Sequence, residues 1–102
     1  MNKPMSRRYE KMPDDDYTGK RGGGKTTHTI KISPAYFNAV KCGAKRFEIR
    51  KNDRNYKSGD IVIMREWNGF EYTGDEATVT ITYVLKNCPE YGLKKGYCVF
   101  GW

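Results

Sequence analysis

Apolar and polar residues alternate in short segments from His28 to the end of the chain, and this two-residue period is typical of β-strands. In residues 28–32, for example, Ile30 and Ile32 fall on one face and Lys31 falls on the other. The same pattern predicts further strands at 45–50, 61–67, 70–72, 77–85 and 97–100.

Two of these segments also predict which side chains face the core. In residues 45–50, we expect Phe47 and Ile49 to point inward and the charged residues around them to point outward. In residues 77–85, the side chains expected on one common face are Val79, Ile81, Tyr83 and Leu85.

One helix is predicted between the first two strands. Ser33 can cap free amides, and Pro34 suits the first helical position because it loses no hydrogen bond there. Gly43 can adopt the left-handed conformation that ends a helix, so we expect the helix from Pro34 to about Cys42. The helical side chains expected to cover the core are Tyr36, Phe37 and Val40.

Turn-forming residues separate the remaining strands. Residues 51–60 and the Thr-Gly-Asp sequence at 73–75 favour turns, residues 86–96 form a loop, and Asn68-Gly69 is a strong hairpin signal. Five to six short strands with one or two short helices predict a mixed α/β, mainly β fold. We expect a compact, partly closed barrel.

Residues 1–27 differ from the rest of the chain. Their Met and Tyr residues follow no period among charged residues, Gly and Pro, so they could not bury an apolar face. We expect a flexible basic N-terminal arm over residues 1–27 and one domain over residues 28–102.

The net charge points to polyanionic partners. Lys and Arg total 19 and Asp and Glu total 12, which gives +7. Such an excess favours nucleic acid as a partner, although it can also serve solubility alone.

The cysteines and the apolar segments limit the kinds of site and the cellular location that we expect. Cys42, Cys88 and Cys98 are odd in number and unclustered, which argues against a disulfide framework and a zinc site. We therefore expect no metal and no cofactor. No apolar run is long enough for a membrane span or a secretion signal, so we expect a cytoplasmic monomer without membrane contact.

Residues 19–26 match the phosphate-loop pattern G-x-x-x-x-G-K-[ST]. A functional loop of this kind needs a buried strand before it and a helix after it. Here Asp-Asp-Asp-Tyr-Thr precedes the match, and Thr-His-Thr-Ile-Lys-Ile, which predicts a strand, follows it. We therefore interpret the match as a basic tether that could contact phosphates and not as a triphosphatase site.

Positive charge is densest in residues 41–57, where seven Lys and Arg residues and two acidic residues give 7 − 2, or +5. A strand edge kept basic to prevent strand pairing is one explanation. Nucleic-acid contact is the other. It is favoured because Glu48 lies between Arg46 and Arg50 on one strand face, just after a helix end where a cleft can form.

The same region contains Gly-x-Lys-x-x-Glu-x-Arg at Gly43, Lys45, Glu48 and Arg50, followed by Arg-Lys-Asn-Asp-Arg at 50–54 and by Gly59-Asp60. With His28-x-x-Lys31, these motifs make residues 28–102 resemble a phage and bacterial domain family of unknown function in the ASCH superfamily. The resemblance implies a PUA-like β-barrel that binds RNA or a modified nucleoside in a cleft beside the helix.

One branch of the ASCH superfamily is enzymatic and removes the acetyl group of acetylcytidine with a Lys, a Thr and a Glu. Lys45 falls on that lysine, but Glu48 falls on the threonine, and a carboxylate cannot replace the attacking hydroxyl. Hydrolysis of a modified nucleoside or of RNA is thus the alternative function, with Lys45, Glu48 and His28 as candidate catalytic residues. A lone His at the start of a strand is, however, more often structural.

RNA binding is the preferred hypothesis. The candidate contact residues are Lys31, Lys45, Arg46, Glu48, Arg50, Lys51, Asn52, Arg54, Tyr56 and Trp67. The cations would meet phosphates, and Glu48 would accept a hydrogen bond from a base or ribose or would simply position Arg50. Aromatic side chains, Tyr72 among them, would stack on an unpaired base or pack in the core. A third possibility is a phage-type interaction module that uses the loops around Asn68 and Asn87.

Overall fold

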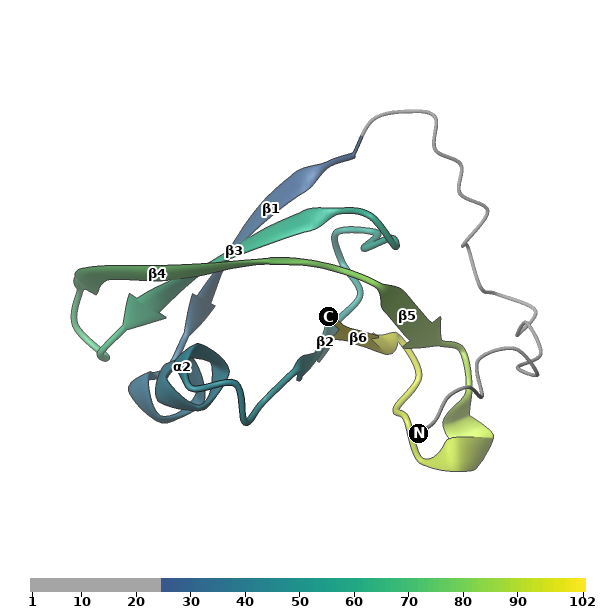
Figure 1. The fold of residues 1–102 in the computed structure, drawn as a ribbon. Coiled ribbons are helices and arrows are strands. Elements are labelled where there is room, and N and C mark those ends of the chain that lie inside the picture. The colour runs from purple at the N-terminus through teal and green to yellow at the C-terminus, as the bar shows by residue number, and fades with distance from the viewer. Residues whose placement is uncertain (1–24) are drawn as a thin grey trace.

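The computed structural model describes residues 25–102, which form two three-stranded sheets with one α-helix beside them (Figure 1). In chain order the elements are β1 (Thr27–Ile32), α2 (Pro34–Lys41), β2 (Phe47–Lys51), β3 (Ile61–Trp67), β4 (Tyr72–Thr80), β5 (Tyr83–Lys86), the 3-10 helix η2 (Pro89–Tyr91) and β6 (Tyr97–Gly101). The predicted mainly β fold is confirmed. Most of the predicted arm, and the start of the phosphate-loop match, lie outside the described residues.

The end of the phosphate-loop match is described, and a strand follows it directly. Lys25 and Thr26 lead into β1, so the helix that a phosphate loop requires is absent from this position. The expectation of a strand after the match is confirmed.

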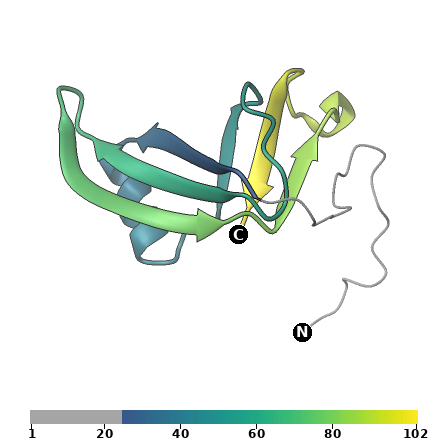
Figure 2. The same cartoon turned by 90° about the horizontal axis from the view of Figure 1, so that it is seen from above.

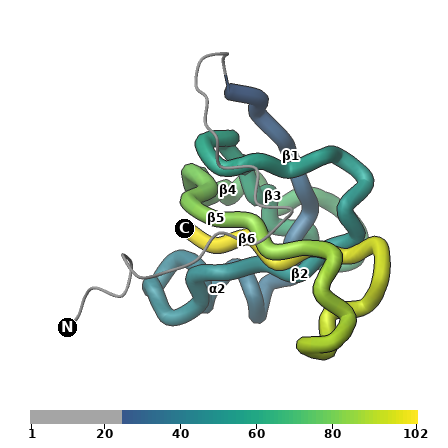
Figure 3. Tube along the Cα trace, turned by 90° about the vertical axis from the view of Figure 1, so that its right-hand side faces the viewer, coloured from purple at the N-terminus to yellow at the C-terminus, as the bar shows by residue number. Residues whose placement is uncertain are grey.

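The two sheets are joined where β4 runs on into β5 (Figure 2). In the first sheet, β3 pairs in parallel with β1 and antiparallel with β4. In the second sheet, β6 lies between β2 and β5 and is antiparallel to both. Within residues 25–102, no ladder joins β1 to β2, so the two sheets do not close into a barrel and the side between these strands is open. The loop of residues 87–96 reaches beyond the sheets at the end away from α2 (Figures 1 and 3).

The core lies between the two sheets and is closed at one end by α2. Its main members are Ile30, Ile32, Phe37, Val40, Tyr56, Val62, Met64, Ile81, Val84, Cys98 and Phe100. Burial of each large apolar side chain contributes roughly 1.5–3 kcal/mol, so this cluster dominates the stability of the domain.

The helix largely follows the prediction. It ends at Lys41, and Gly43 adopts a φ of +85° just beyond, as expected for a terminating glycine. Phe37 and Val40 are buried, but Tyr36 is 58% exposed, so its predicted core position is wrong. A helix of eight residues presents one narrow stripe to the core, and Tyr36 lies about 100° away from Phe37 around the axis.

The inward face of β2 is the reverse of the predicted one. Phe47 and Ile49 are 46% and 54% exposed, whereas Glu48 is only 6% exposed. Register with β6 places Glu48 opposite the buried Phe100. The alternation was therefore correct, but alternation alone cannot tell which face is buried.

The predicted turn at 73–75 and the single strand at 77–85 are also wrong. β4 continues through Gly74, which takes a φ of +101° within the strand instead of reversing the chain. The strand at 77–85 is interrupted at residues 81–82, where the chain passes from one sheet to the other. Beyond this corner Val84 is buried, while its neighbours Tyr83 and Leu85 are only partly buried.

Two of the cysteines differ sharply in accessibility. Cys42 is exposed just after α2, whereas Cys98 in β6 is fully buried, and burial raises the pKa of the Cys98 thiol to about 11. Because the thiolate is the nucleophile, iodoacetamide at mildly alkaline pH should label Cys42 well before Cys98. Peptide mass spectrometry of the native protein would measure this order. The denatured protein serves as control, and equal labelling of both thiols in the native protein would contradict it.

Candidate functional site

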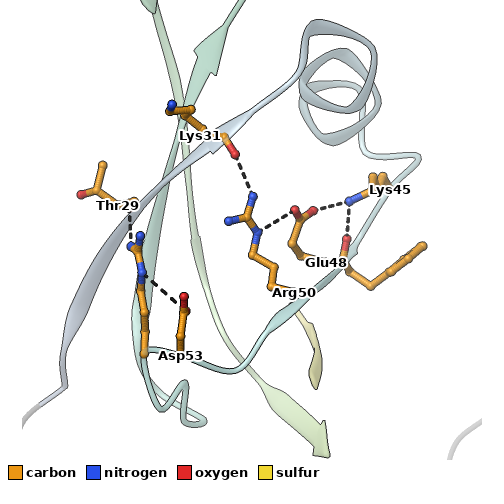
Figure 4. A network of polar contacts seen from close by, with 8 residues as sticks. Thr29, Lys31, Lys45, Glu48, Arg50 and Asp53 are labelled. Carbon is orange, nitrogen blue, oxygen red and sulfur yellow. Dashed lines mark hydrogen bonds and ion pairs between the residues drawn. The ribbon is translucent and has the colours of Figure 1, made fainter. Parts of the chain in front are cut away.

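The open side between β1 and β2, called the seam below, is bridged by arginine side chains. Arg50 Nη2 donates to the Lys31 carbonyl at 2.9 Å, and Arg54 Nη1 donates to the Thr29 carbonyl at 2.6 Å (Figure 4). Both carbonyls belong to the edge strand β1. The guanidinium groups thus supply donors to backbone acceptors that would otherwise need a neighbouring strand or water.

Glu48 lies next to the seam and holds two cations at once (Figure 4). Its Oε1 lies 2.5 Å from Lys45 Nζ, and its Oε2 lies 3.2 Å from Arg50 Nε. The side chains of Glu48, Lys45 and Arg50 are 8%, 14% and 28% exposed, respectively. Glu48 and Arg50 are two residues apart in β2 and therefore share its inner face. One carboxylate neutralises one of two cations, so this Glu48 cluster has a net charge of +1.

Both cations of the Glu48 cluster retain N–H groups for a further acceptor. Lys45 uses one donor on Glu48 and one on the Phe47 carbonyl at 2.7 Å, while an ammonium group has three. Arg50 bonds to Glu48 and to the Lys31 carbonyl, while a guanidinium group has five donors. The cluster is thus an ordered cationic site that can still bind an anion.

Two exposed aromatic rings flank Lys45. Its Nζ lies 5.2 Å from the ring centroid of Tyr36 and 5.0 Å from that of Phe47. Sequence reasoning missed both rings because it assigned them to the core. The available signal was the shortness of the helix, which leaves Tyr36 no second buried stripe.

His28 and Tyr56 are buried in the core and are not among the side chains that Glu48 holds. His28 is 6% exposed, and its Nε2 lies 2.8 Å from Asp60 Oδ2. Tyr56 is 1% exposed, and its ring centroid lies 4.7 Å from His28 and 4.8 Å from Phe100. Of the three candidate catalytic residues, Lys45 and Glu48 are brought together, while His28 is joined to Asp60, which sequence reasoning did not select.

Four other predicted contact residues lie at the ends of β2 or in the turn that follows it. Arg46 and Lys51 are exposed at the two ends of β2. Arg54 is half-exposed and lies 3.9 Å from Asp53, while Asn52 Oδ1 accepts a hydrogen bond from the Tyr56 amide at 3.4 Å. Lys31 of β1 and residues 45–54 together carry six cations and two acids, which gives 6 − 2, or +4: Lys31, Lys45, Arg46, Arg50, Lys51 and Arg54 against Glu48 and Asp53.

Lys31 and Trp67 meet on the outer face of the β1-β3-β4 sheet. The Lys31 side chain is exposed, and its Nζ lies 4.3 Å from the centroid of the Trp67 ring. The carbonyl of Lys31 faces the seam, so this residue belongs to both surfaces.

The described residues contain neither a metal-binding cluster nor a membrane-spanning helix. Over residues 25–102, no group of three or more His, Cys, Asp or Glu side chains is arranged to hold a metal ion. The helices of the same residues are too short or too polar to cross a membrane.

Comparison with known proteins adds a family and one relative. The model of a family described as "Domain of unknown function (DUF3850)" matches residues 27–102, which include every strand and helix described above. Residues of this chain are also 44% identical over 57 positions to the "Uncharacterized 12.9 kDa protein in GpA 3'region" of Escherichia phage P2. That alignment covers 56% of this chain and 52% of the phage protein, so it spans about half of the relative.

Proposed function

We propose that this chain, which belongs to the family described as a domain of unknown function (DUF3850), binds RNA or a modified nucleoside at the seam. The finer parts of the proposal are an ASCH-type, PUA-like barrel and a monomer in a reducing, cytoplasmic setting. Support for the barrel comes from two sheets that enclose one core and are linked by the continuous chain from β4 to β5.

The observation that carries the proposal is the convergence of Lys45 and Arg50 on Glu48 beside two exposed rings. A single-stranded nucleotide offers phosphate for the cations, a π-face for the rings, and amino or hydroxyl donors for Glu48. The buried carboxylate would favour ligands that carry such a donor over bare phosphate, because it repels an anion that brings none.

Charge supports RNA over a neutral partner. Lys31 and residues 45–54 have the +4 balance given above, and flexible single strands follow such cationic tracks with strongly salt-dependent affinity. Arg50 and Arg54 already make hydrogen bonds that hold the fold together. We therefore expect the exposed Arg46 and Lys51 to contribute phosphate contacts that can be removed without unfolding the domain.

The test is binding of a fluorescent single-stranded RNA as a function of salt. Each phosphate contact to a single strand contributes about −0.7 to the slope of log K against log salt. Replacing Arg46→Gln and Lys51→Gln together should therefore reduce the slope by about 1.4 units and weaken binding roughly tenfold at low salt. Fluorescence anisotropy measures both quantities.

A matched control removes two charges elsewhere. Lys94 and Lys95 are exposed in the 87–96 loop and are not among the proposed contact residues, so Lys94→Gln with Lys95→Gln loses the same charge. An equal loss of affinity in both double variants would mean that binding is only a response to net charge. Absence of RNA binding at low salt would reject the proposal and favour the protein-interaction alternative.

The hydrolase alternative has less geometric support. Both oxygens of Glu48 are engaged with cations, and residues 45–50 contain no hydroxyl that could attack an acyl group. The alternative requires that the wild-type protein form product from acetylcytidine or RNA and that Lys45→Ala form none. Mass spectrometry of the reaction mixture would detect the product.

A further inference from the structure

The outer face of the β1-β3-β4 sheet has a second group of aromatic and cationic side chains. Trp67 and Tyr72 meet edge to face with centroids 4.9 Å apart. Lys31 Nζ covers Trp67 at 4.3 Å, and the Arg65 guanidinium covers Tyr72 at 3.9 Å. Each cation is attracted to the ring face that it covers, and the Lys31 side chain remains exposed.

A hollow of about 280 Å³ lies beside Trp67, between the start of α2 and the β3–β4 hairpin. Its walls include Lys31, Pro34, Trp67, Asn68 and Gly69. Sites for drug-sized ligands span roughly 300–1,000 Å³, so this hollow suits a single ring system and not a larger molecule.

The hairpin fixes which polar atom Asn68 can offer to a ligand. Asn68 Oδ1 accepts hydrogen bonds from the amides of Phe70 at 2.8 Å and Glu71 at 3.0 Å. These two bonds orient the side-chain amide, so that its Nδ2 group is the donor left for an outside acceptor. Such a donor beside a stacking ring suits the carbonyl oxygen of a nucleobase.

We propose that this hollow binds one unpaired base of a single-stranded RNA, stacked on Trp67 and bonded to Asn68. Lys31 moves from the indole ring to the adjacent phosphate when the base enters. This inference rests on the proposed RNA-binding function and adds to it a second base site.

Lys31 makes the two sites continuous. Its carbonyl accepts Arg50 at the seam, while its side chain lines the hollow. An RNA strand that crosses the edge strand β1 can therefore place one nucleotide at the Glu48 cluster and another on Trp67. The positive end of the α2 dipole, near Ser33 and Pro34, is suitably placed to favour the phosphate between them.

The experiment uses Trp67 as its own reporter. The chain has two tryptophans, and Trp102 packs against Phe100 in the core, so Trp102→Phe leaves Trp67 as the only source of indole emission. An oligouridylate should quench this emission in a saturable way because the base stacks on the ring, whereas inorganic polyphosphate should not. Stacking is worth about 1–3 kcal/mol per base, so Trp67→Ala should weaken oligouridylate binding roughly tenfold.

Further variants separate stacking from charge and from loss of fold. Trp67→Phe should recover much of the affinity, because a smaller ring remains. Lys31→Met should reduce the salt slope by about 0.7, whereas Trp67→Ala should leave that slope unchanged. Tyr91→Ala removes a ring that is 71% exposed outside both sites and should leave affinity unchanged.

The two proposals fail in different ways. If Trp67→Ala binds oligouridylate with unchanged affinity and no quenching accompanies binding, the base site in the hollow is overturned while RNA binding at the seam stands. If the wild-type chain binds no RNA at low salt, the proposed function fails and the base site fails with it.

Discussion

Glu48→Ala is expected to lower the free energy of unfolding by about 3 kcal/mol. The carboxylate is 8% exposed and holds Lys45 and Arg50, which are 14% and 28% exposed. Removing it leaves two partly buried cations that repel each other and have lost their acceptor. Breaking a fully buried pair costs about 3–5 kcal/mol, and we take the lower end because Arg50 retains access to water.

A double-mutant cycle in urea measures this cost. Lys45→Met should be milder than Glu48→Ala, because Arg50 still pairs with Glu48. The double variant should cost less than the sum of the two single variants, because Lys45→Met removes one of the unpaired cations.

A surface pair provides the matched control. Glu76 lies 3.4 Å from Arg65, and these side chains are 50% and 38% exposed, so Glu76→Ala should cost about 0.5 kcal/mol or less. If Glu48→Ala proves as mild as Glu76→Ala, the Glu48 cluster is no more than a solvated surface pair.

Sequence patterns correctly predicted the elements that depend on a few adjacent residues. β3 was placed at 61–67 because apolar residues run between two turn-rich segments, and the chain turns at Asn68-Gly69 as predicted, with a positive φ at Gly69. The helix start at Pro34 and the left-handed Gly43 were predicted for the same reason. Each of these features depends on a few adjacent residues.

The features that were missed depend on residues far apart in the chain. The buried face of β2 is set by register with β6 and by the bond from Arg50 to Lys31, which are 19 residues apart. Alternation in residues 45–50 is the same whichever face is inside. The change of sheets at 81–82 is likewise invisible to a two-residue period, because only the neighbours β3 and β6 determine where each part pairs.

The candidate site was predicted in composition but not in arrangement. The spacing of Glu48 and Arg50 puts both on one strand face. The ion pair between Glu48 and Lys45 joins two members of the Gly-x-Lys-x-x-Glu-x-Arg motif. Their position on the inner face, and the use of Arg50 and Arg54 to bridge to β1, required the folded chain. Exposure of Phe47 followed from the same reversal, whereas exposure of Tyr36 followed from the narrow buried stripe of the short helix.

Asp60→Ala is expected to lower the free energy of unfolding by about 3 kcal/mol, because one buried and two part-buried donors lose their acceptor and each such loss costs about 1–3 kcal/mol. Asp60 is 4% exposed and accepts hydrogen bonds from the amides of Thr26 at 3.2 Å and Lys57 at 3.0 Å. His28 Nε2 lies 2.8 Å from the same carboxylate. The side chain therefore ties the start of β1 to the turn that leads into β3.

Asp60→Asn is the informative partner of this variant. The amide keeps one acceptor oxygen, so we expect about half of the destabilisation, measured by urea unfolding. Asp75→Ala, at an exposed position of β4, is the control and should change stability by about 0.5 kcal/mol or less. Equal stability of Asp60→Asn and Asp60→Ala would show that the acceptor oxygens are not what holds this region together.

RNA binding by Asp60→Asn then separates structure from function. If the His28–Asp60 pair is structural, the folded variant should bind RNA with unchanged affinity and salt slope, because neither side chain is exposed. A stable, folded variant that loses RNA binding would instead place His28 in the functional site and revive it as a proton-transfer residue. The buried position of His28, which packs against the tilted ring of Tyr56, favours the first result.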